Sequence, residues 1–454
     1  MVGLFVYIGI ILIVLLFAGS LLMGALKRIK TGRNIVLVSF LIGSVLVVSG
    51  CTGASIASDH AAQAGKLLWQ HTYGGPGVNS DPSVIRTSDG GYAIAGSTII
   101  LADNVTTFYN TSRIYLVKTD SNGAEVWNRT YRSGIYASSV VQTADGGYAI
   151  AGQTYRDPVL LKTDASGNEQ WNTSLIFNTS HSNSVMINSL VLTKDGNYIV
   201  MGNLVGSLLV AEIGANGKTI WSKTYESYNG RSLIITSDGG YVVVGNGVGS
   251  EFKPFLIKID KDGNQMWNKS YMPSFIAASN TSTNMCIGYA VIQTSDGGYA
   301  LTGTSSSIST NISSNVTTVS INSNVMLVKT DVNGDEVWNR TYEGSGDNEG
   351  MAMVQNDDGS YTIACVENPS FTSVSSSDIL SNETQLFNQL LQYHLYLIGA
   401  DSTGKEIWKN DYGLIGNGRV LSLIRSGDGG YIVSGLINSS DNLVERKIFL
   451  EKIA

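Results

Sequence analysis

Residues Gln293–Gly303 read QTSDGGYALTG, and this pattern occurs seven times along the chain. The other copies, some of them looser, begin at Arg86, Gln142, Leu192, Ile235, Gln355 and Arg425. Asp-Gly is a strong hairpin signal because glycine adopts a positive φ without penalty. We therefore interpret DGGY first as a tight turn between two strands, with its Tyr packed between neighbouring repeat units.

A second pattern contains every tryptophan of the chain. Each Trp ends a segment such as TDVNGDEVW (330–338), in which a glycine turn comes just before it. The seven positions are Trp69, Trp127, Trp171, Trp221, Trp267, Trp338 and Trp408. Successive tryptophans lie 44 to 71 residues apart. A repeat of this length with four short strands per unit is typical of a β-propeller.

One repeat unit shows the four strands. The pattern predicts strands at 138–143, 148–154, 159–164 and 169–174, because runs of β-branched and apolar residues alternate there with turn residues. The turns between the first and second strands and between the third and fourth strands are short and uniform.

The two ends of the repeat region complete each other. The last unit ends at Ala454 after its third strand, so it lacks a fourth strand. Residues 66–73 are predicted to form a fourth strand, but no first, second or third strand comes before them. Joining them predicts an all-β fold, a ring of seven four-stranded antiparallel blades over residues 65–454. A closed ring leaves no exposed sheet edge.

The N-terminal segment has a different character. Residues 3–23 carry no charge and are long enough to cross a bilayer. The basic segment KRIKTGR (27–33) and a second apolar run then lead to VSGC, which ends at Cys51 and resembles a lipoprotein signal. We expect residues 1–50 to form a membrane helix, a signal segment or both.

Two alternatives stay open for this anchor. Translation begins at Met1 or at Met23, and Cys51 either bears lipid as the first mature residue or is an ordinary residue of a two-helix hairpin. Either way the basic loop stays inside. We therefore expect a flexible linker at 51–64 and a propeller on the extracytoplasmic face of the cell membrane.

Composition excludes several classes of function. The net charge is −7 and no Lys/Arg cluster follows Arg33, which argues against nucleic acid. Three cysteines make no disulfide framework, and no Cys/His cluster offers a metal site. The segment 260–264 (DKDGN) has its glycine at the fourth position, whereas a calcium loop needs it at the sixth. The sequence therefore predicts neither cofactor nor metal.

The segment ADSTGKEIW (400–408) resembles the tryptophan-docking motif of PQQ-like (quinoprotein-type) and WD40-like propeller repeats. The resemblance runs from about Gly65 to Ala454 and implies that each Trp docks against the next blade. It is strongest to surface-exposed propeller lipoproteins of archaea and bacteria. Enzymes of that family bind PQQ with calcium and often carry adjacent cysteines, which this chain lacks. TSDGG also partly resembles the Asp-box of sialidases, without its Trp.

Insertions are predicted on one face of the ring. Long loops at 97–113, 304–324, 366–392 and 271–287 share the face opposite the DGGY turns, and variable loops often carry function. The alternative is passive Ser/Thr-rich decoration. Because the tether before Gly65 enters on the DGGY side, we expect that side to look toward the membrane.

The number of possible N-glycosylation sites is modestly above the number expected by chance, and five of the twelve lie in the loops 97–113, 304–324 and 366–392. They are Asn104, Asn110, Asn128, Asn172, Asn178, Asn268, Asn280, Asn311, Asn315, Asn339, Asn382 and Asn438.

The leading hypothesis is a membrane-anchored module that binds or scaffolds an unknown protein or surface glycan through the long-loop face. By resemblance, this includes a scaffold like the lipoprotein propellers of outer-membrane assembly machinery. The alternative is a glycoside-active or quinoprotein-like enzyme with a site near the ring axis. Its candidate acids, each better interpreted as a solvated loop charge, are Asp81, Glu226, Glu343, Asp347 and Glu349. No catalytic constellation is evident, so enzyme activity is the less favoured hypothesis.

Overall fold

The computed structural model describes residues 65–74, 79–99, 112–154, 157–177, 185–248, 253–272, 282–313, 316–344, 346–368, 374–375, 393–416, 419–439 and 442–454. Regular structure in these ranges is β-strand throughout, and none of it is a helix able to span a bilayer. The expected anchor at 1–50 and linker at 51–64 lie outside the described residues. All the strands belong to the unit Gly50–Ala454.

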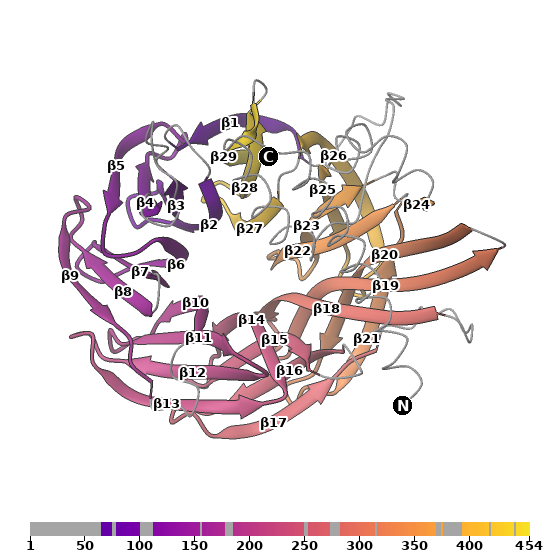
Figure 1. Ribbon diagram of the computed structural model, residues 1–454, viewed down its shortest axis with the longest axis horizontal. Helices are drawn as coiled ribbons and strands as arrows, with labels where there is room; N and C mark the ends of the chain where they lie inside the picture. The colour runs from indigo at the N-terminus through magenta and orange to yellow at the C-terminus, as the bar shows by residue number, and fades with distance from the viewer. Residues whose placement is uncertain are drawn as a thin grey trace, which may run out of the picture. The chain divides into compact units, whose positions relative to one another are not determined.

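Five blades are separate four-stranded antiparallel sheets (Figure 1). The first contains β2 (Asn79–Arg86), β3 (Tyr92–Ile99), β4 (Ser112–Thr119) and β5 (Glu125–Tyr131). The second contains β6 (Tyr136–Gln142), β7 (Tyr148–Gln153), β8 (Pro158–Thr163) and β9 (Glu169–Ser174). The third contains β10 (Met186–Leu192), β11 (Tyr198–Leu204), β12 (Ser207–Ile213) and β13 (Thr219–Glu226). The fourth contains β14 (Tyr228–Ile235), β15 (Tyr241–Gly247), β16 (Pro254–Ile259) and β17 (Gln265–Ser270). The closing blade contains β27 (Arg419–Arg425), β28 (Tyr431–Ser439), β29 (Asn442–Ile453) and β1 (Leu67–Tyr73).

The remaining strands form one nine-stranded sheet. Its first antiparallel set is β18 (Ser282–Gln293), β19 (Tyr299–Ser313), β20 (Val316–Thr330) and β21 (Glu336–Tyr342). Its second is β22 (Asp347–Gln355), β23 (Tyr361–Asn368), β25 (Tyr393–Ala400) and β26 (Glu406–Gly416), and β24 (Val374–Ser375) pairs with β20.

The expectation of seven separate four-stranded blades is therefore wrong: five stand alone, and the other strands share one sheet. The physical reason is the length of β20, which runs past its partner β21. Ser323 of β20 pairs with Asp347, the first residue of β22, and this single parallel bridge joins the two antiparallel sets.

The ring closes as the two chain ends predicted. The innermost strands contact one another in the order β2, β6, β10, β14, β18, β22 and β27, and β27 contacts β2. β1 pairs antiparallel with β29, so an N-terminal strand completes the C-terminal blade (Figure 1). Both edges of β29 are therefore paired, one with β28 and the other with β1.

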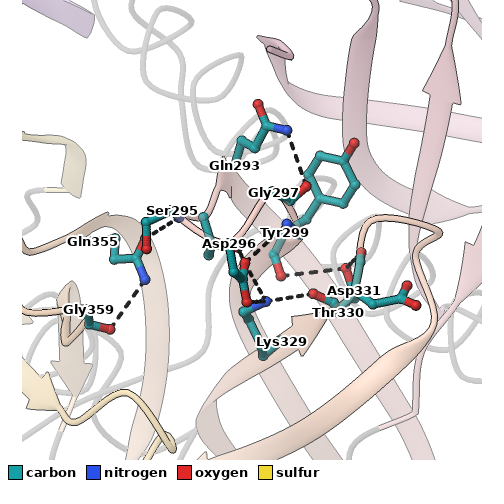
Figure 2. Close-up of polar contacts among 12 residues, drawn as sticks. Gln293, Ser295, Asp296, Gly297, Tyr299, Lys329, Thr330, Asp331, Gln355 and Gly359 are labelled. Atoms are coloured by element: carbon teal, nitrogen blue, oxygen red, sulfur yellow. Dashed lines mark hydrogen bonds and ion pairs between the residues drawn. The ribbon is translucent and has the colours of Figure 1, made fainter. Parts of the chain in front are cut away.

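The DGGY segments are turns between the first and second strands of each blade, as the sequence predicts. Figure 2 shows the turn at Asp296. Gly297 has φ +84°, and its amide donates to the carbonyl of Thr294 at 2.9 Å. Asp296 accepts hydrogen bonds from Thr294 and from the amide of Gly298. One carboxylate thus holds the turn at both ends.

In five of the seven units a lysine with a mostly buried side chain joins this turn to the third strand of its blade. The Nζ of Lys329, whose side chain is 7% exposed, lies 2.8 Å from Asp296 and 2.7 Å from the carbonyl of Thr330. Desolvation raises the pKa of Asp296, but the hydrogen bonds from Lys329, Thr294 and the amide of Gly298 outweigh it and lower this pKa to about 2. The same pair recurs as Asp89–Lys118, Asp145–Lys162, Asp238–Lys258 and Asp428–Lys452.

The second glycine of DGG leaves room for this lysine. A methyl group on Gly298 would lie 2.7 Å from Lys329 Nζ and 2.2 Å from the carbonyl oxygen of Thr330. In two looser copies of the motif, both the second glycine and the lysine are replaced. Asn197 takes the place of the glycine where Glu212 takes that of the lysine, and Ser360 does so where Gly399 takes that of the lysine. The glycine and the lysine therefore act as one unit of the turn.

Neighbouring blades dock through the tryptophans. Six of the seven indole rings pack on the Tyr that begins the second strand of the next blade, with centroids 5.9 to 6.4 Å apart. A methyl group on Gly334 would lie 2.6 Å from Trp267, so the ring covers the glycine turn of the next blade. Trp408 differs and lies against Gly399 of its own blade.

A tyrosine four residues after the Trp completes most of these seams. The buried hydroxyl of Tyr271 donates to the carbonyl of Gly334 at 2.8 Å. Tyr73, Tyr131, Tyr225 and Tyr342 make the corresponding bond to the next blade. Leu175 takes this place after Trp171 and packs in the core instead.

The expectation of a loop at 304–324 is wrong. These residues are mainly strand, because β19 and β20 pair without interruption from Tyr299↔Thr330 to Ser313↔Val316. Alternating Ser, Thr and β-branched residues suit a strand as well as a loop. Residues 100–111, 376–392 and 273–281 of the other long insertions lie outside the described part of the chain.

We predict that Asp296→Asn destabilises the propeller by about 1–3 kcal/mol, because the buried Lys329 ammonium loses its counter-charge. Urea unfolding of the full-length chain measures this. The matched control is Asp262→Asn, whose partner Lys261 is 74% exposed. That variant should change stability by less than about 1 kcal/mol. Equal effects of both changes would contradict the role given to Lys329.

The closing blade contains one conspicuous buried acid. Glu451 is 2% exposed and accepts a hydrogen bond from Gln70 of β1 at 2.6 Å. Its Oε2 has no partner among the described residues. Burial raises the pKa of Glu451 from 4.5 to about 7. The corresponding residues of the other units are aliphatic: Val117, Leu161, Ala211, Ile257, Val328 and Ile398.

We predict that Glu451→Gln stabilises the closed ring at pH 8 by up to about 3 kcal/mol. The folded carboxyl keeps a proton that the unfolded chain releases above pH 4.5, so wild-type stability falls as pH rises from 4.5 to about 7. Glutamine removes this loss and keeps a partner for Gln70. Unfolding at pH 4.5 and 8 tests it, with the exposed Glu226→Gln as control. An unchanged pH dependence in Glu451→Gln would contradict the prediction.

Candidate functional site

Each innermost strand has an irregularity at a matching position. In β6, β10, β14, β18, β22 and β27 the pairing register shifts by one residue, which is the mark of a β-bulge. The residue before each bulge is buried, whereas the bulge residue and the residue two before it are at least partly accessible. These accessible positions form two levels along the innermost strands.

Charged residues gather at these levels on four consecutive inner strands. Arg231 and Tyr289 are the bulge residues of β14 and β18, and Glu349 and Arg419 stand two residues before the bulges of β22 and β27. The guanidinium carbon of Arg231 lies 5.3 Å from the centre of the Tyr289 ring. Tyr289 also donates a hydrogen bond to the Glu349 carboxylate. We call Arg231, Tyr289, Asp347, Glu349 and Arg419 the axial cluster.

The electrostatics of the axial cluster raise the pKa of Glu349 to near neutral pH. Desolvation and the neighbouring Asp347 raise its pKa from 4.5 to about 7, although Arg419, Arg231 and the hydrogen bond from Tyr289 work in the opposite direction. Burial likewise raises the pKa of Tyr289. Glu349 can therefore exchange a proton in the physiological range.

Asp347 and Asn348 hold this cluster in place. Asp347 is 5% exposed, and its backbone pairs with Ser323. The amide of the fully buried Asn348 donates to the carbonyls of Ser323 and Gly346, and its oxygen accepts from Tyr396. The same residues that fuse the two parts of the nine-stranded sheet thus position Glu349.

The predicted acids separate into two groups. Asp347 and Glu349 are not solvated loop charges, because both belong to β22 and face other blades. Glu226 and Glu343 are exposed at or just beyond the ends of β13 and β21. Asp81 belongs to β2, and its side chain lies outside what the structure describes. Of the four acids whose side chains the structure describes, Asp347 and Glu349 come together.

Sequence reasoning missed Arg231, Tyr289 and Arg419. They occupy strands predicted to be innermost, but nothing in the repeat pattern sets them apart. Counting residues back from each DGGY turn places these positions in register: Arg231 and Tyr289 each stand seven residues before the Asp of their turn. Counting back from the turn would therefore have placed Arg231 and Tyr289 at the same position of their inner strands.

The sequence model of one protein family matches residues 38–269, which is just over half of the 454 residues. That family is described as outer membrane protein assembly factor BamB. The chain belongs to this PQQ-like β-propeller family. None of the curated proteins matches it in sequence.

Solved structures resemble the chain at low identity. The Dos1 propeller has a TM-score of 0.48 at 10% identity, with 86% of this chain and 95% of that chain covered. A protein from Lactobacillus plantarum has a TM-score of 0.46 at 13% identity, covering 74% and 85%. Drosophila Plexin A in complex with Semaphorin 1b gives 0.44 at 7% identity, covering 87% and 88%.

Among the described residues of this PQQ-like propeller, no side chains assemble a quinone–calcium site. In the described ranges no three His, Cys, Asp or Glu side chains lie close enough together to hold a cation. Cys286 and Cys365 are both buried, free thiols on different strands, β18 and β23. Nothing in the described side chains offers the adjacent cysteine pair of the family's enzymes.

The predicted modification sites fall mostly outside the described residues or on side chains that are not described. The four that are described, Asn128, Asn172, Asn268 and Asn339, directly follow a Trp on the fourth strand of a blade. Asn128 and Asn172 donate to Glu125 and Glu169 three residues earlier. Cys51 lies outside the described residues.

Proposed function

We propose that the protein is a membrane-anchored, extracytoplasmic propeller that binds or scaffolds a protein or a surface glycan. The observation that carries this proposal is the long β19–β20 hairpin. Its strands have 15 residues each, whereas β15 and β16 of the preceding blade have 7 and 6. The hairpin therefore extends roughly 25 Å further, at about 3.3 Å per residue.

The register supports a role for this hairpin as a contact surface. Tyr299↔Thr330 lies at the DGGY end of the blade and Ser313↔Val316 at the far end, so the extension lies at the end of the blade away from the short turn. In Figure 1, β19 and β20 project beyond the rest of the ring. β24, from a second insertion, pairs with Thr318 and Val319 of β20. Two insertions thus build one surface that the core of the ring does not need.

The name of the matching family agrees with this proposal. It describes an outer membrane protein assembly factor, that is, a propeller that serves other proteins. By this likeness we favour a protein partner over a glycan. A role in the assembly of other envelope proteins is the most specific form of the proposal.

The start of the ring supports the proposed orientation. The carbonyl of Lys66 accepts a hydrogen bond from the amide of Ala454 at 3.0 Å, and a methyl group on Gly430 would lie 2.2 Å from the carbonyl of Ile453. The chain therefore enters the propeller beside a DGG turn. A linker of 14 residues reaches at most roughly 50 Å, which favours the short-turn face as the membrane side.

We predict that a photo-crosslinking residue at Asn322 of the hairpin captures a discrete partner in intact cells. The matched control position is Asn333, which is also exposed but lies in a turn at the DGGY end of the blade. A second variant replaces residues 308–321 with Asn-Gly, which keeps the Ser307↔Asn322 pair next to a two-residue turn. It should keep the wild-type melting temperature and lose the crosslinked partner. Equal capture from both positions, or capture that survives trimming, would count against this surface.

We also predict that Cys51 is the first residue of the mature chain and carries lipid. Mass spectrometry of the membrane-extracted protein should give a mass that begins at Cys51 with an acyl addition, and Cys51→Ser should abolish it. A mature chain that still contains KRIKTGR would show instead that the anchor is a helix.

A further inference from the structure

The two levels of the innermost strands differ in chemistry around the ring. Glu349 and Arg419 occupy the level two residues before the bulge, and Tyr136 of β6 and Met186 of β10 occupy the same level in other blades. Tyr136 is 41% exposed and Met186 is 63% exposed. Large apolar side chains that stay exposed on inner strands offer contact area to a ligand. The axis is therefore lined by a charged sector and an apolar sector.

The two arginines of the axial cluster have capacity to bind an anion. Among the described residues, neither the Arg231 nor the Arg419 guanidinium makes a hydrogen bond or an ion pair, although Arg231 stacks on Tyr289. Each guanidinium carries five N–H donors that suit a carboxylate geometrically. Arg231 is exposed and Arg419 is half-buried, so both can be reached from solvent.

We propose that the axial cluster binds the carboxylate group of a ligand with an apolar body. Arg231 and Arg419 receive the carboxylate beside Tyr289 and Glu349, and the apolar body extends toward Tyr136 and Met186. A small organic acid and the free C-terminus of a polypeptide both present this chemistry. This site is separate from the extended part of the β19–β20 hairpin and goes beyond the proposed partner-binding role.

Charge balance couples binding to a proton. The groups that act on Glu349 are Asp347 of its own strand, Arg419 from β27, Arg231 from β14 and Tyr289 from β18. With Glu349 protonated, the two arginines face one ionised acid, Asp347, which leaves one excess positive charge. A bound carboxylate neutralises this charge. With Glu349 ionised, the two arginines face two ionised acids, the cluster is neutral, and it no longer attracts a carboxylate. Binding therefore takes up a proton and weakens as pH rises above about 7.

The test is calorimetric titration of the full-length chain in detergent with sodium hexanoate and with hexanamide, its neutral analogue. At about pH 6, where Glu349 is protonated, hexanoate should bind at least about tenfold more tightly than hexanamide, because hydrogen bonds to a charged group are the stronger ones. Arg419→Gln should lower hexanoate affinity about tenfold and leave hexanamide unchanged. Glu349→Gln should keep hexanoate binding but abolish its decline between about pH 6 and 8.

The control variant is Arg425→Gln, whose guanidinium pairs with Asp357 at the turn face and which should bind hexanoate as wild type does. Equal affinity for hexanoate and hexanamide, or unchanged hexanoate binding in a folded Arg419→Gln protein, would overturn the proposal. A melting curve of each variant establishes folding. The peptide Ala-Ala-Leu, with a free or an amidated C-terminus, separates the two sources. Tighter binding of the free peptide than of hexanoate identifies a polypeptide terminus, and the reverse order identifies a small acid.

Discussion

The contact between one blade's tryptophan and the next blade's tyrosine is the interaction on which the ring depends. A single four-stranded meander cannot bury both of its faces, so each blade is stable only between two neighbours. The indole covers the following Tyr and the following glycine turn, as Trp267 covers Tyr299 and Gly334. This contact fixes the angle at which one blade follows another. Trp69 of β1 makes it across the closing seam, with Tyr92.

Two units of the repeat replace the common contacts with others. The third unit lacks the buried lysine, and there Glu212 accepts hydrogen bonds from Asn197 and from the indole N–H of Trp221. The turn thus exchanges one polar network for another while the Trp stays in place. In the sixth unit Gly399 leaves space into which Trp408 moves. The hydrogen bonds that replace the lysine therefore lie within one blade, whereas the aromatic contacts join one blade to the next.

The positions available for function are those that the repeat leaves undetermined. The bulges turn two side chains of each inner strand away from the packed faces, and their identity is free to vary between blades. Arg231, Tyr289, Glu349 and Arg419 use this freedom, and the fused sheet supports Glu349 through Asn348. The hairpin β19–β20 uses the other freedom, which is loop length on the face opposite the DGGY turns. Both features lie where changes leave the Trp–Tyr seams intact.

The sequence alone determined the blade and how the ring closes. Turn residues with positive φ, strand alternation and a Trp in each unit are local signals, and the unpaired strands at 66–73 and at the C-terminus required one another. The strand character of 304–324 and the bridge from Ser323 to Asp347 came only from tertiary structure, because Ser, Thr and Asn suit both strand and loop. The axial cluster also required it. Its residues lie up to 188 positions apart, from Arg231 to Arg419, and only the curvature of the ring brings their strands together.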